Sequence, residues 1–480
     1  MYKIDWKKYL CEERWRTSGK PDAGMGDYRT PFESDYGRVL FSSAIRRMHD
    51  KTQVIPLTNG DSVLTRLTHS IQVMNLAESL INNYCRSEEF KRQYTGEEGY
   101  ALAANLVAIV RAAAFVHDVG NPPFGHFGET IIQDYFREKR ELLKSQFLKE
   151  EDSTAEVDRK ILDFTEFDGN AQGLRILTKL QYMGNLDGLN LTYATLAAYM
   201  KYPNPGVVDK SYIGTKKHGV FCSEESIFKK IVDECKLREA SRRIRRHPLS
   251  FIVEAADSIA YLVMDIEDGY NLGWYDFETL IKEIDSYLPQ SIEKIVGFSR
   301  KTLEGGEKGS KKLIVDFRVK LIQYLVNKAR CNFEENLKGI DEGTYGKELI
   351  EDDENGVAFA LQRFSMAYII SHQSINRVEM SGHSVLNGLL DVLSFYAFHK
   401  DEKYRRKLKS ILSSSRIALA MHENMGNEGK YQNYDRNEIC DCDLGDFGYY
   451  ARWRIIVDFI SGMTDKYAVE LYQQLSGQTI

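Results

Sequence analysis

Two polar pairs lie within residues 117–129, the stretch HDVGNPPFGHFGE. His117 and Asp118 place an imidazole beside a carboxylate at the end of a long apolar segment. His126 and Glu129 follow a Pro-Pro turn and are spaced i, i+3, so they would share one face of a helix. The first pair has the donor types of a metal site, and the second has those of a general acid–base pair. Together they predict hydrolytic chemistry.

Histidine–aspartate dipeptides also arise by chance, and the chain contains a second one, His49-Asp50. It lies in the polar stretch RRMHDKTQ, and a solvated helix end explains it. His117-Asp118 instead ends the apolar run ALAANLVAIVRAAAFV. Because a buried imidazole or carboxylate needs hydrogen-bond partners or a metal, the second dipeptide is the better candidate.

Further polar groups are placed to join it. Arg66 and His69 lie three residues apart, so one helix face would carry a fixed cation and another imidazole. Asp257, Tyr261 and Asp265 recur every four residues in EAADSIAYLVMD and form one stripe on an apolar helix. The alternative for this stripe is an interhelical hydrogen-bond network. We favour a ligand site, because unpaired polar groups are costly to bury.

The residues His69, His117, Asp118 and Asp257 would form a mixed nitrogen and oxygen ligand set without thiolate. Such a set suits a six-coordinate manganese, magnesium or iron(II) ion, with positions left for water or phosphate. Nickel, cobalt and zinc remain open.

Helical periodicity extends through most of the chain, and strand-like alternation is rare, so the predicted fold is all-α. We expect helices over 36–49, 62–83, 98–118, 126–148, 170–182, 190–201, 249–268, 313–335, 358–378, 383–399, 402–423 and 450–475. Two stretches, the charged 143–162 and the Gly/Lys-rich 301–312, are predicted to be insertions or partly disordered loops.

Composition indicates a cytoplasmic protein. The chain has 480 residues, a formal net charge of −6 and seven cysteines without a disulfide framework. Cys440-Asp441-Cys442 could clip a metal, but no partner pair lies nearby. The longest apolar run, 101–116, contains Asn105 and Arg111 and is expected to be too short for a bilayer. The net charge counts against general affinity for nucleic acids or membranes.

Seven ordered blocks resemble one known family. They are RTPFESDYGRVLFSSAIRRMHDKTQV, LTRLTHSIQV, HDVGNPPFGHFGE, FDGNAQGLRIL, LTYATLAAYMKYP, EAADSIAYLVMDIEDG and DFISGMTDKYA. The chain is similar to the deoxyguanosine triphosphate triphosphohydrolases (dGTPases) among the HD-domain phosphohydrolases. The resemblance implies cleavage of dGTP, or of several dNTPs, to the deoxynucleoside and inorganic triphosphate. It also implies an HD-type catalytic core at 1–270 and a C-terminal helical region at 271–480 that packs on the core and contributes to oligomerisation.

By the same resemblance, the metal ligands are His69, His117, Asp118 and Asp257. His126 and Glu129 match the catalytic pair. His126 would protonate the leaving 5′ oxygen or act as the in-line group, and Glu129 would orient the imidazole.

The resemblance also assigns substrate contacts. Arg66 matches a phosphate clamp, and the triphosphate contacts are Asn170, Lys201 and Tyr202. Gln53 and Asp265 match residues that bind the sugar 3′ hydroxyl, and Tyr261 matches the ring that leaves no room for a 2′ hydroxyl. Taken alone, Asn170 could be a helix N-cap, and Lys201-Tyr202-Pro203 could be a helix end. No residue is assigned to the base.

Other hypotheses remain beside this one. The chain could be another HD-domain nucleotide phosphohydrolase, or a catalytically silent protein that binds nucleotides or single-stranded DNA. The basic stretch KLREASRRIRRHP (236–248) could bind such an effector or be a solvated helix face. Arg454 could complete a neighbouring subunit's site or form an internal salt bridge, and Ser258 stands where relatives have a second acid. The resemblance implies a homo-oligomer, a hexamer or a tetramer.

Overall fold

The computed structural model describes residues 2–16, 28–51, 53, 64–151, 153–181, 187–238, 243–298, 306–351 (306–311 as backbone only), 353–424, 439 and 441–478. The described part contains helices and no named strand, which confirms the all-α prediction. In the first half the elements are η1 (Trp6–Lys8), α1 (Pro31–Leu40), α2 (Ser43–Met48), α3 (Arg66–Cys85), α4 (Glu88–Gln93), α5 (Gly96–Phe115), α6 (Gly125–Glu138), α7 (Arg140–Phe147), α8 (Thr154–Thr165), α9 (Gly169–Arg175), η2 (Ile176–Leu180), α10 (Tyr193–Tyr199), η3 (Ile213–Thr215), η4 (Cys222–Glu224) and α11 (Glu225–Glu234).

The second half continues the helical pattern to the C-terminus. Its elements are α12 (Pro248–Asn271), α13 (Phe277–Asp285), α14 (Ile292–Val296), α15 (Gly306–Glu335), α16 (Leu337–Asp341), α17 (Val357–Ser365), η6 (Met366–Ile370), α18 (Gln373–Ala397), α19 (Glu402–Ile411), α20 (Ser414–Asn424), η7 (Leu444–Asp446), α22 (Tyr449–Ser461) and α23 (Asp465–Leu475).

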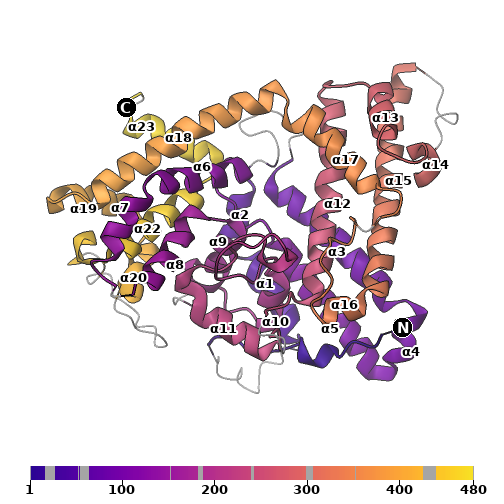
Figure 1. Cartoon of the computed structure of the whole chain (residues 1–480), viewed down its shortest axis with the longest axis horizontal. Coiled ribbons are helices and arrows are strands. Elements are labelled where there is room, and N and C mark those ends of the chain that lie inside the picture. The colour runs from indigo at the N-terminus through magenta and orange to yellow at the C-terminus, as the bar shows by residue number, and fades with distance from the viewer. Residues whose placement is uncertain are drawn as a thin grey trace.

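Two hydrophobic clusters hold these helices together. The larger one surrounds α3, α5 and α12, and the long helix α15 packs along α12 (Figure 1). The second joins α6 and α8 to α18, α22 and α23, and α18 crosses above α6 along one edge of the molecule (Figure 1). Both clusters draw residues from either side of residue 270, and our division of the chain at that point stays a prediction.

Local capping places the helices that carry the site. Thr65 forms a capping box with Thr68, so α3 begins at Arg66. The side chain of His247 caps α12, and Pro248 occupies its first turn, where a missing N–H is harmless. The starting points of α3 and α12 are therefore fixed by their own local sequence.

Several predicted helices differ from the observed ones in where they are interrupted. The predicted helix 36–49 is two helices, because Ser42 caps α2. The predicted helix 402–423 is α19 and α20, and 126–148 is α6 and α7. The predicted break between 378 and 383 is wrong: His372 caps α18, which then continues unbroken to Ala397.

The prediction that 143–162 is a partly disordered loop is also wrong, and whether it is an insertion stays untested. This stretch forms the end of α7 and most of α8, and Leu143, Phe147, Val157 and Ile161 are buried in the second cluster. Its high charge conceals a helical spacing of apolar residues. The other predicted loop, 301–312, lies largely outside the described residues.

Helix α5 is longer than the apolar run suggested. Its 20 residues are long and apolar enough to cross a membrane by length and composition alone. However, α5 packs against α1, α3, α10 and α12. It is therefore placed as a core helix of the larger cluster, for which apolar composition is expected.

Buried ion pairs join α9 to the C-terminal helices α20 and α22. Arg175 on α9 contacts Asp458 on α22 and Glu423 on α20, with N–O distances of 2.8 Å for each pair. Arg454 is 1% exposed and donates to Gln172 and Asp458. It lies in the interior of its own chain, so the hypothesis that it completes a neighbour's site is wrong.

The other sequence hypotheses have mixed outcomes. His49 and Asp50 are well exposed at the end of α2, which confirms the solvated helix end. In the basic stretch, Arg246 is buried against Glu254 and Arg245 donates to the carbonyl of Asp341. Residues 239–242 and Cys440 lie outside the described residues, so effector binding and a cysteine metal clip stay untested.

The cap of α12 makes stability depend on pH. Burial lowers the pKa of His247 to about 4, and its Nδ1 accepts from the Leu249 N–H, which requires the neutral ring. The folded pKa lies below the unfolded value of about 6.5, so this stabilisation is present above pH 6.5 and is lost as pH falls towards 4. His247→Asn keeps a capping oxygen but cannot titrate.

We expect the fall in melting temperature between pH 7 and pH 4.5 to be smaller in His247→Asn than in the wild type. The difference corresponds to a free energy of unfolding on the order of 3 kcal/mol at most. Differential scanning fluorimetry across this pH range measures it, and the exposed His383→Asn variant is the control. Parallel pH profiles for His247→Asn and the wild type would contradict the assignment.

Candidate active site

Side chains from three segments meet at one point. The Nε2 atom of His69 lies 3.1 Å from Asp257 Oδ1, and the Nε2 atom of His117 lies 3.3 Å from the same oxygen. One ligand atom from each of the three residues lies within 4.8 Å of the others. Asp118 adjoins them, with Oδ1 at 3.6 Å from His117 Nε2. The fold thus brings together all four predicted ligands, which are far apart in sequence.

The helices explain this convergence. His69 is in the first turns of α3, and Asp257 is in the middle of α12, which packs on α3. His117 and Asp118 follow the end of α5 in a tight turn, in which Val119 N donates to Val116 O. The end of α5 therefore places His117 and Asp118 where α3 and α12 are in contact.

The residues present fit a divalent ion. His117 Nδ1 donates to the carbonyl oxygen of Ala114 at 2.8 Å, so the lone pair of a neutral ring lies on Nε2. That Nε2 atom is buried and makes no hydrogen bond with a described residue. A buried nitrogen oriented in this way, beside a second imidazole and two carboxylates, is the arrangement that a metal ligand requires.

Electrostatics supports the same conclusion. Burial lowers the pKa of His117, but the carboxylates of Asp118 and Asp257 outweigh it and raise that pKa to about 9. Burial raises the pKa of Asp118, but Arg66 and His117 lower it to about 2. The cluster thus retains ionised carboxylates and attracts positive charge, which a proton or a metal ion can supply.

His126 and Glu129 form a second pair on α6. His126 Nδ1 lies 3.1 Å from Glu129 Oε2, and the His126 side chain is 76% exposed within the cleft, whereas Glu129 is buried. Glu129 Oε1 accepts the backbone N–H of Gly169 at 2.9 Å, an approach that leaves no room for a Cβ atom at residue 169. The carboxylate is fixed and the imidazole faces the cleft.

Their pKa values move in opposite directions. The carboxylate of Glu129 raises the pKa of His126. Burial raises the pKa of Glu129, but His126 outweighs it and lowers that pKa to about 2. The pair therefore favours an imidazolium beside a carboxylate, the state in which His126 can donate a proton from Nε2.

The turn between the two pairs is conformationally unusual. Phe124 has φ of 63° and Gly125 has φ of 59°, so consecutive residues adopt the left-handed region. A Cβ atom at Gly125 would lie 2.5 Å from the guanidinium of Arg66. A non-glycine residue in this region is strained, and such strain concentrates at functional sites.

One cleft of about 510 Å³ collects the predicted residues. Those that line it are Gln53, Arg66, His117, Asp118, His126, Asn170, Lys201, Tyr202, Asp257, Tyr261 and Asp265. The remaining two contact this set directly: His69 contacts Asp257, and Glu129 contacts His126. The stripe on α12 thus faces a cleft, which favours a ligand site over an interhelical network.

Cations gather along one part of the cleft. Arg66 Nη1 donates to Asp118 Oδ2, and Lys201 Nζ lies 3.4 Å from Glu254 Oε1. Lys217 also lines the cleft, with Nζ 3.6 Å from Glu129 Oε2 and 2.7 Å from Asp168 Oδ2. Lys217 could not be predicted from the sequence, because it lies in an irregular loop without helical spacing to a motif.

Asn170 is not a helix cap, since Asp168 holds that position. The Asp168 carboxylate accepts from the backbone N–H and the side-chain amide of Asn170, both at 2.8 Å. Tyr199 OH donates to the carbonyl of Asn170. Lys201 and Tyr202 follow the end of α10, and both also line the cleft. They are therefore more than the helix end that the sequence alone allowed.

The other part of the cleft contains acceptors without donors. Gln53 Oε1 and Asp265 Oδ1 are buried and make no hydrogen bond with a described residue. Burial raises the pKa of Asp265 well above its usual value. Buried acceptors without partners are costly, so both are suited to receive donors from a ligand.

The C-terminal region completes the wall of this cleft. Ile370, Ile375, Val378 and Glu379 line it from η6 and α18, and none was predicted. Glu348 also lines it and accepts from Ser258 Oγ at 2.9 Å, so the serine binds an acid from another segment.

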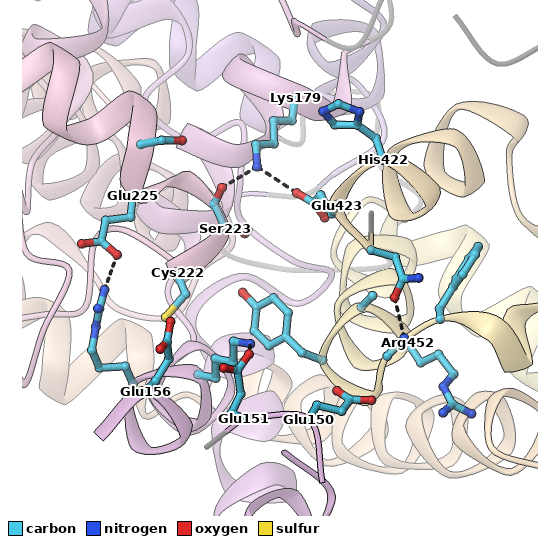
Figure 2. A pocket seen from close by; sticks show the side chains of 18 of the residues that line it. Glu150, Glu151, Glu156, Lys179, Cys222, Ser223, Glu225, His422, Glu423 and Arg452 are labelled. Atoms are coloured by element: carbon cyan, nitrogen blue, oxygen red, sulfur yellow. Dashed lines mark hydrogen bonds and ion pairs between the residues drawn. The ribbon is translucent and has the colours of Figure 1, made fainter. Parts of the chain in front are cut away.

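A larger hollow of about 1210 Å³ lies elsewhere, between α8, α11, α20 and α22. Opposite charges along its walls pair with one another, and Figure 2 shows Lys179 between Ser223 and Glu423. Among the described residues, the possible metal cluster is in the smaller cleft and not here. The smaller cleft is therefore the candidate active site.

Comparisons with known proteins agree with this geometry. A family model described as an HD domain matches residues 66–169, and one described as a phosphohydrolase-associated domain matches 444–474. A deoxyguanosinetriphosphate triphosphohydrolase-like protein of Listeria monocytogenes is 32% identical over 99% of this chain and 100% of that protein. The probable deoxyguanosinetriphosphate triphosphohydrolase of Pseudomonas aeruginosa is 30% identical, with 98% and 99% covered. The deoxyguanosinetriphosphate triphosphohydrolase of Yersinia pseudotuberculosis is also 30% identical, with the same coverage.

Fold, site and family model place the chain in the HD-domain class. Within that class it belongs to the deoxyguanosinetriphosphate triphosphohydrolase family.

We expect His117→Ala and Asp257→Ala to weaken Mn²⁺ binding by more than about tenfold, since even outer contacts of metal sites have effects of that size. Isothermal titration of chelator-treated protein measures the affinity, and circular dichroism checks that the helices remain. His49→Ala, in the solvated dipeptide, is the matched control and should bind as the wild type does. Wild-type affinity in His117→Ala would contradict the ligand assignment.

Proposed function

We propose that this protein hydrolyses dGTP, or several dNTPs, to the deoxynucleoside and inorganic triphosphate. The observation that carries the proposal is one cleft that combines a metal-type cluster, an imidazolium–carboxylate pair and three cationic side chains. Each corresponds to a need of the reaction: activation of water, protonation of a leaving oxygen and binding of a polyanion.

In this proposal His69, His117, Asp118 and Asp257 hold a divalent ion. Such an ion polarises a phosphoryl group and lowers the pKa of bound water. Manganese, magnesium and iron(II) suit the nitrogen and oxygen donors best, and nickel, cobalt and zinc are the alternatives.

The chain's own residues supply the rest of the mechanism. Arg66, Lys201 and Lys217 neutralise the triphosphate, together with contacts from Asn170 and Tyr202. Preorganised charges of this kind act most strongly where water is excluded. His126 donates a proton from Nε2 to the leaving 5′ oxygen, and Glu129 holds the ring through Nδ1.

The acceptor end of the cleft fits a deoxyribose. Gln53 and Asp265 offer buried oxygens that have no donor among the described residues. A 3′ hydroxyl would donate its one hydrogen to Gln53 Oε1 and accept from the carboxyl of Asp265, whose pKa burial raises well above its usual value. Tyr261 lies one helical turn from both Asp257 and Asp265, so its ring borders the sugar position. A 2′ hydroxyl would meet this ring, which favours deoxynucleotides.

The competing hypotheses explain less of the cleft. A nucleotidase or cyclic-nucleotide esterase binds one phosphate and does not need three cations beside the metal-type cluster. A catalytically silent binding protein has no use for the ordered His126–Glu129 pair. We further propose a cytoplasmic homo-oligomer, a hexamer or a tetramer. Regulation by a nucleotide or single-stranded DNA effector stays a prediction.

We expect the purified protein with Mn²⁺ to release inorganic triphosphate and a deoxynucleoside from dGTP. Ion-exchange chromatography of the products of each dNTP measures this. His126→Ala should still bind nucleotide while its turnover falls by about 10²-fold or more, because the proton donor is lost. Pyrophosphate, orthophosphate or no product from the wild type would reject the proposed reaction, whereas full activity in His126→Ala would reject only the role of that residue.

Removal of the Tyr261 ring should relax the sugar preference. In Tyr261→Ala we expect the ratio of kcat/KM for GTP to that for dGTP to rise by about tenfold or more, because a steric barrier is removed. Tyr261→Phe keeps the ring and is the matched control, with discrimination close to the wild type. An unchanged ratio in Tyr261→Ala would show that another group excludes the ribose.

A further inference from the structure

Lys51 is a buried lysine between three segments of the active site. Its side chain is almost fully buried, and Nζ donates to the carbonyl oxygens of Asn121 at 2.6 Å and Ser461 at 2.9 Å. Its own carbonyl oxygen accepts the backbone N–H of Arg66 at 2.8 Å. One residue thus joins the start of α3, the turn after the histidine–aspartate pair and the end of α22.

Stability alone does not explain this lysine. Among the described residues, no carboxylate forms an ion pair with its Nζ atom. Burial, and next the nearby Arg47, lower the pKa of Lys51 to about 7. A buried cation bound only by carbonyl oxygens is expensive to desolvate, and an apolar side chain of similar volume would avoid that cost.

Lys51 contacts the loop that connects the predicted metal ligand Asp118 to the predicted catalytic residue His126. The 121–125 loop runs from Asn121 to Gly125 and separates Asp118 from His126. Asn121 Nδ2 donates to Asp118 Oδ1 at 2.6 Å, so the position of Asn121 helps to set that carboxylate. At its other end, the loop passes through the left-handed residues Phe124 and Gly125. Such a loop keeps its shape only if its surroundings hold it.

The second support of this loop comes from the same C-terminal junction. Asp465, the first residue of α23, accepts the backbone N–H of Phe124 at 2.9 Å. Ser461, which accepts from Lys51, is the last residue of α22. The junction between α22 and α23 therefore contacts the loop at both ends, once through Lys51 and once directly.

We propose that Lys51 is a positioning residue that ties the α22–α23 junction to the 121–125 loop and so sets Asp118 and His126 relative to each other. It does so without touching substrate. The inference rests on the proposed function and deepens it, because it makes the C-terminal region a structural part of the catalytic site.

The test compares Lys51→Met with the wild type. Methionine keeps most of the side-chain volume but donates no hydrogen bond. We expect kcat for dGTP to fall by about tenfold to a hundredfold with KM changed less than about threefold, because orientation and not substrate affinity is lost. Hydrogen–deuterium exchange without metal should become at least about tenfold faster in peptides that cover 117–126, while peptides from α3 and α5 stay protected.

Lys179→Met is the matched control. Lys179 is also a mostly buried lysine that donates to a backbone carbonyl, that of Ser223, but it lies in the larger hollow away from the catalytic cleft. Its loss should lower the melting temperature and leave both kcat and exchange at 117–126 near wild type. Asp465→Ala removes the other support of the loop and should reproduce the effects of Lys51→Met, which keeps the test decisive if Lys51→Met does not fold.

The outcomes separate this inference from the proposed function. If Lys51→Met and Asp465→Ala only lower the melting temperature, with kcat and exchange at 117–126 unchanged, Lys51 is merely structural and the inference is wrong. If the wild type releases no triphosphate, the proposed function fails, and the exchange experiment still decides whether Lys51 and Asp465 hold the loop. Faster exchange confined to 117–126 together with a selective loss of kcat supports both.

Discussion

The site depends on charges that neutralise one another inside the protein. Asp118 and Asp257 lie together, both partly buried, and Arg66, His69 and His117 against them keep them ionised. Those five groups come from the start of α3, the end of α5 and the middle of α12, so the three helices must pack in one register. The apolar cluster around them fixes this register. The five groups come together only when the three helices pack in this way.

Much of this arrangement could be predicted from sequence. Helical spacing identified α3, α5 and α12, and residue types within them identified the ligand candidates, because both signals are local. The family resemblance then connected residues that no local pattern relates, such as Gln53 with Asp265. Breaks at Ser42 and His372 were missed, since a single capping hydrogen bond decides them and the apolar period continues on both sides.

The unpredicted parts of the site come from irregular or distant segments. Lys217 lies in a loop, and its role appears only where the fold brings it beside Glu129. Glu348 and Glu379 reach the cleft from the C-terminal region, in stretches without a recognisable motif. Charged composition also misled us at 143–162, where a regular apolar face lies beneath the charges. In contrast to that apolar face, the contacts of Lys217, Glu348 and Glu379 leave no periodic signal in the chain.

One helix carries both the metal-type ligand Asp257 and the buried acceptor Asp265. Asp257 and Asp265 are eight residues apart on α12, which is about 12 Å along a regular helix. A single helix therefore sets the distance between these two groups, whereas η6 and α18 contribute other residues to the lining of the cleft. Because one helix sets this spacing, substitutions in η6 or α18 can reshape their part of the cleft without changing the distance between Asp257 and Asp265.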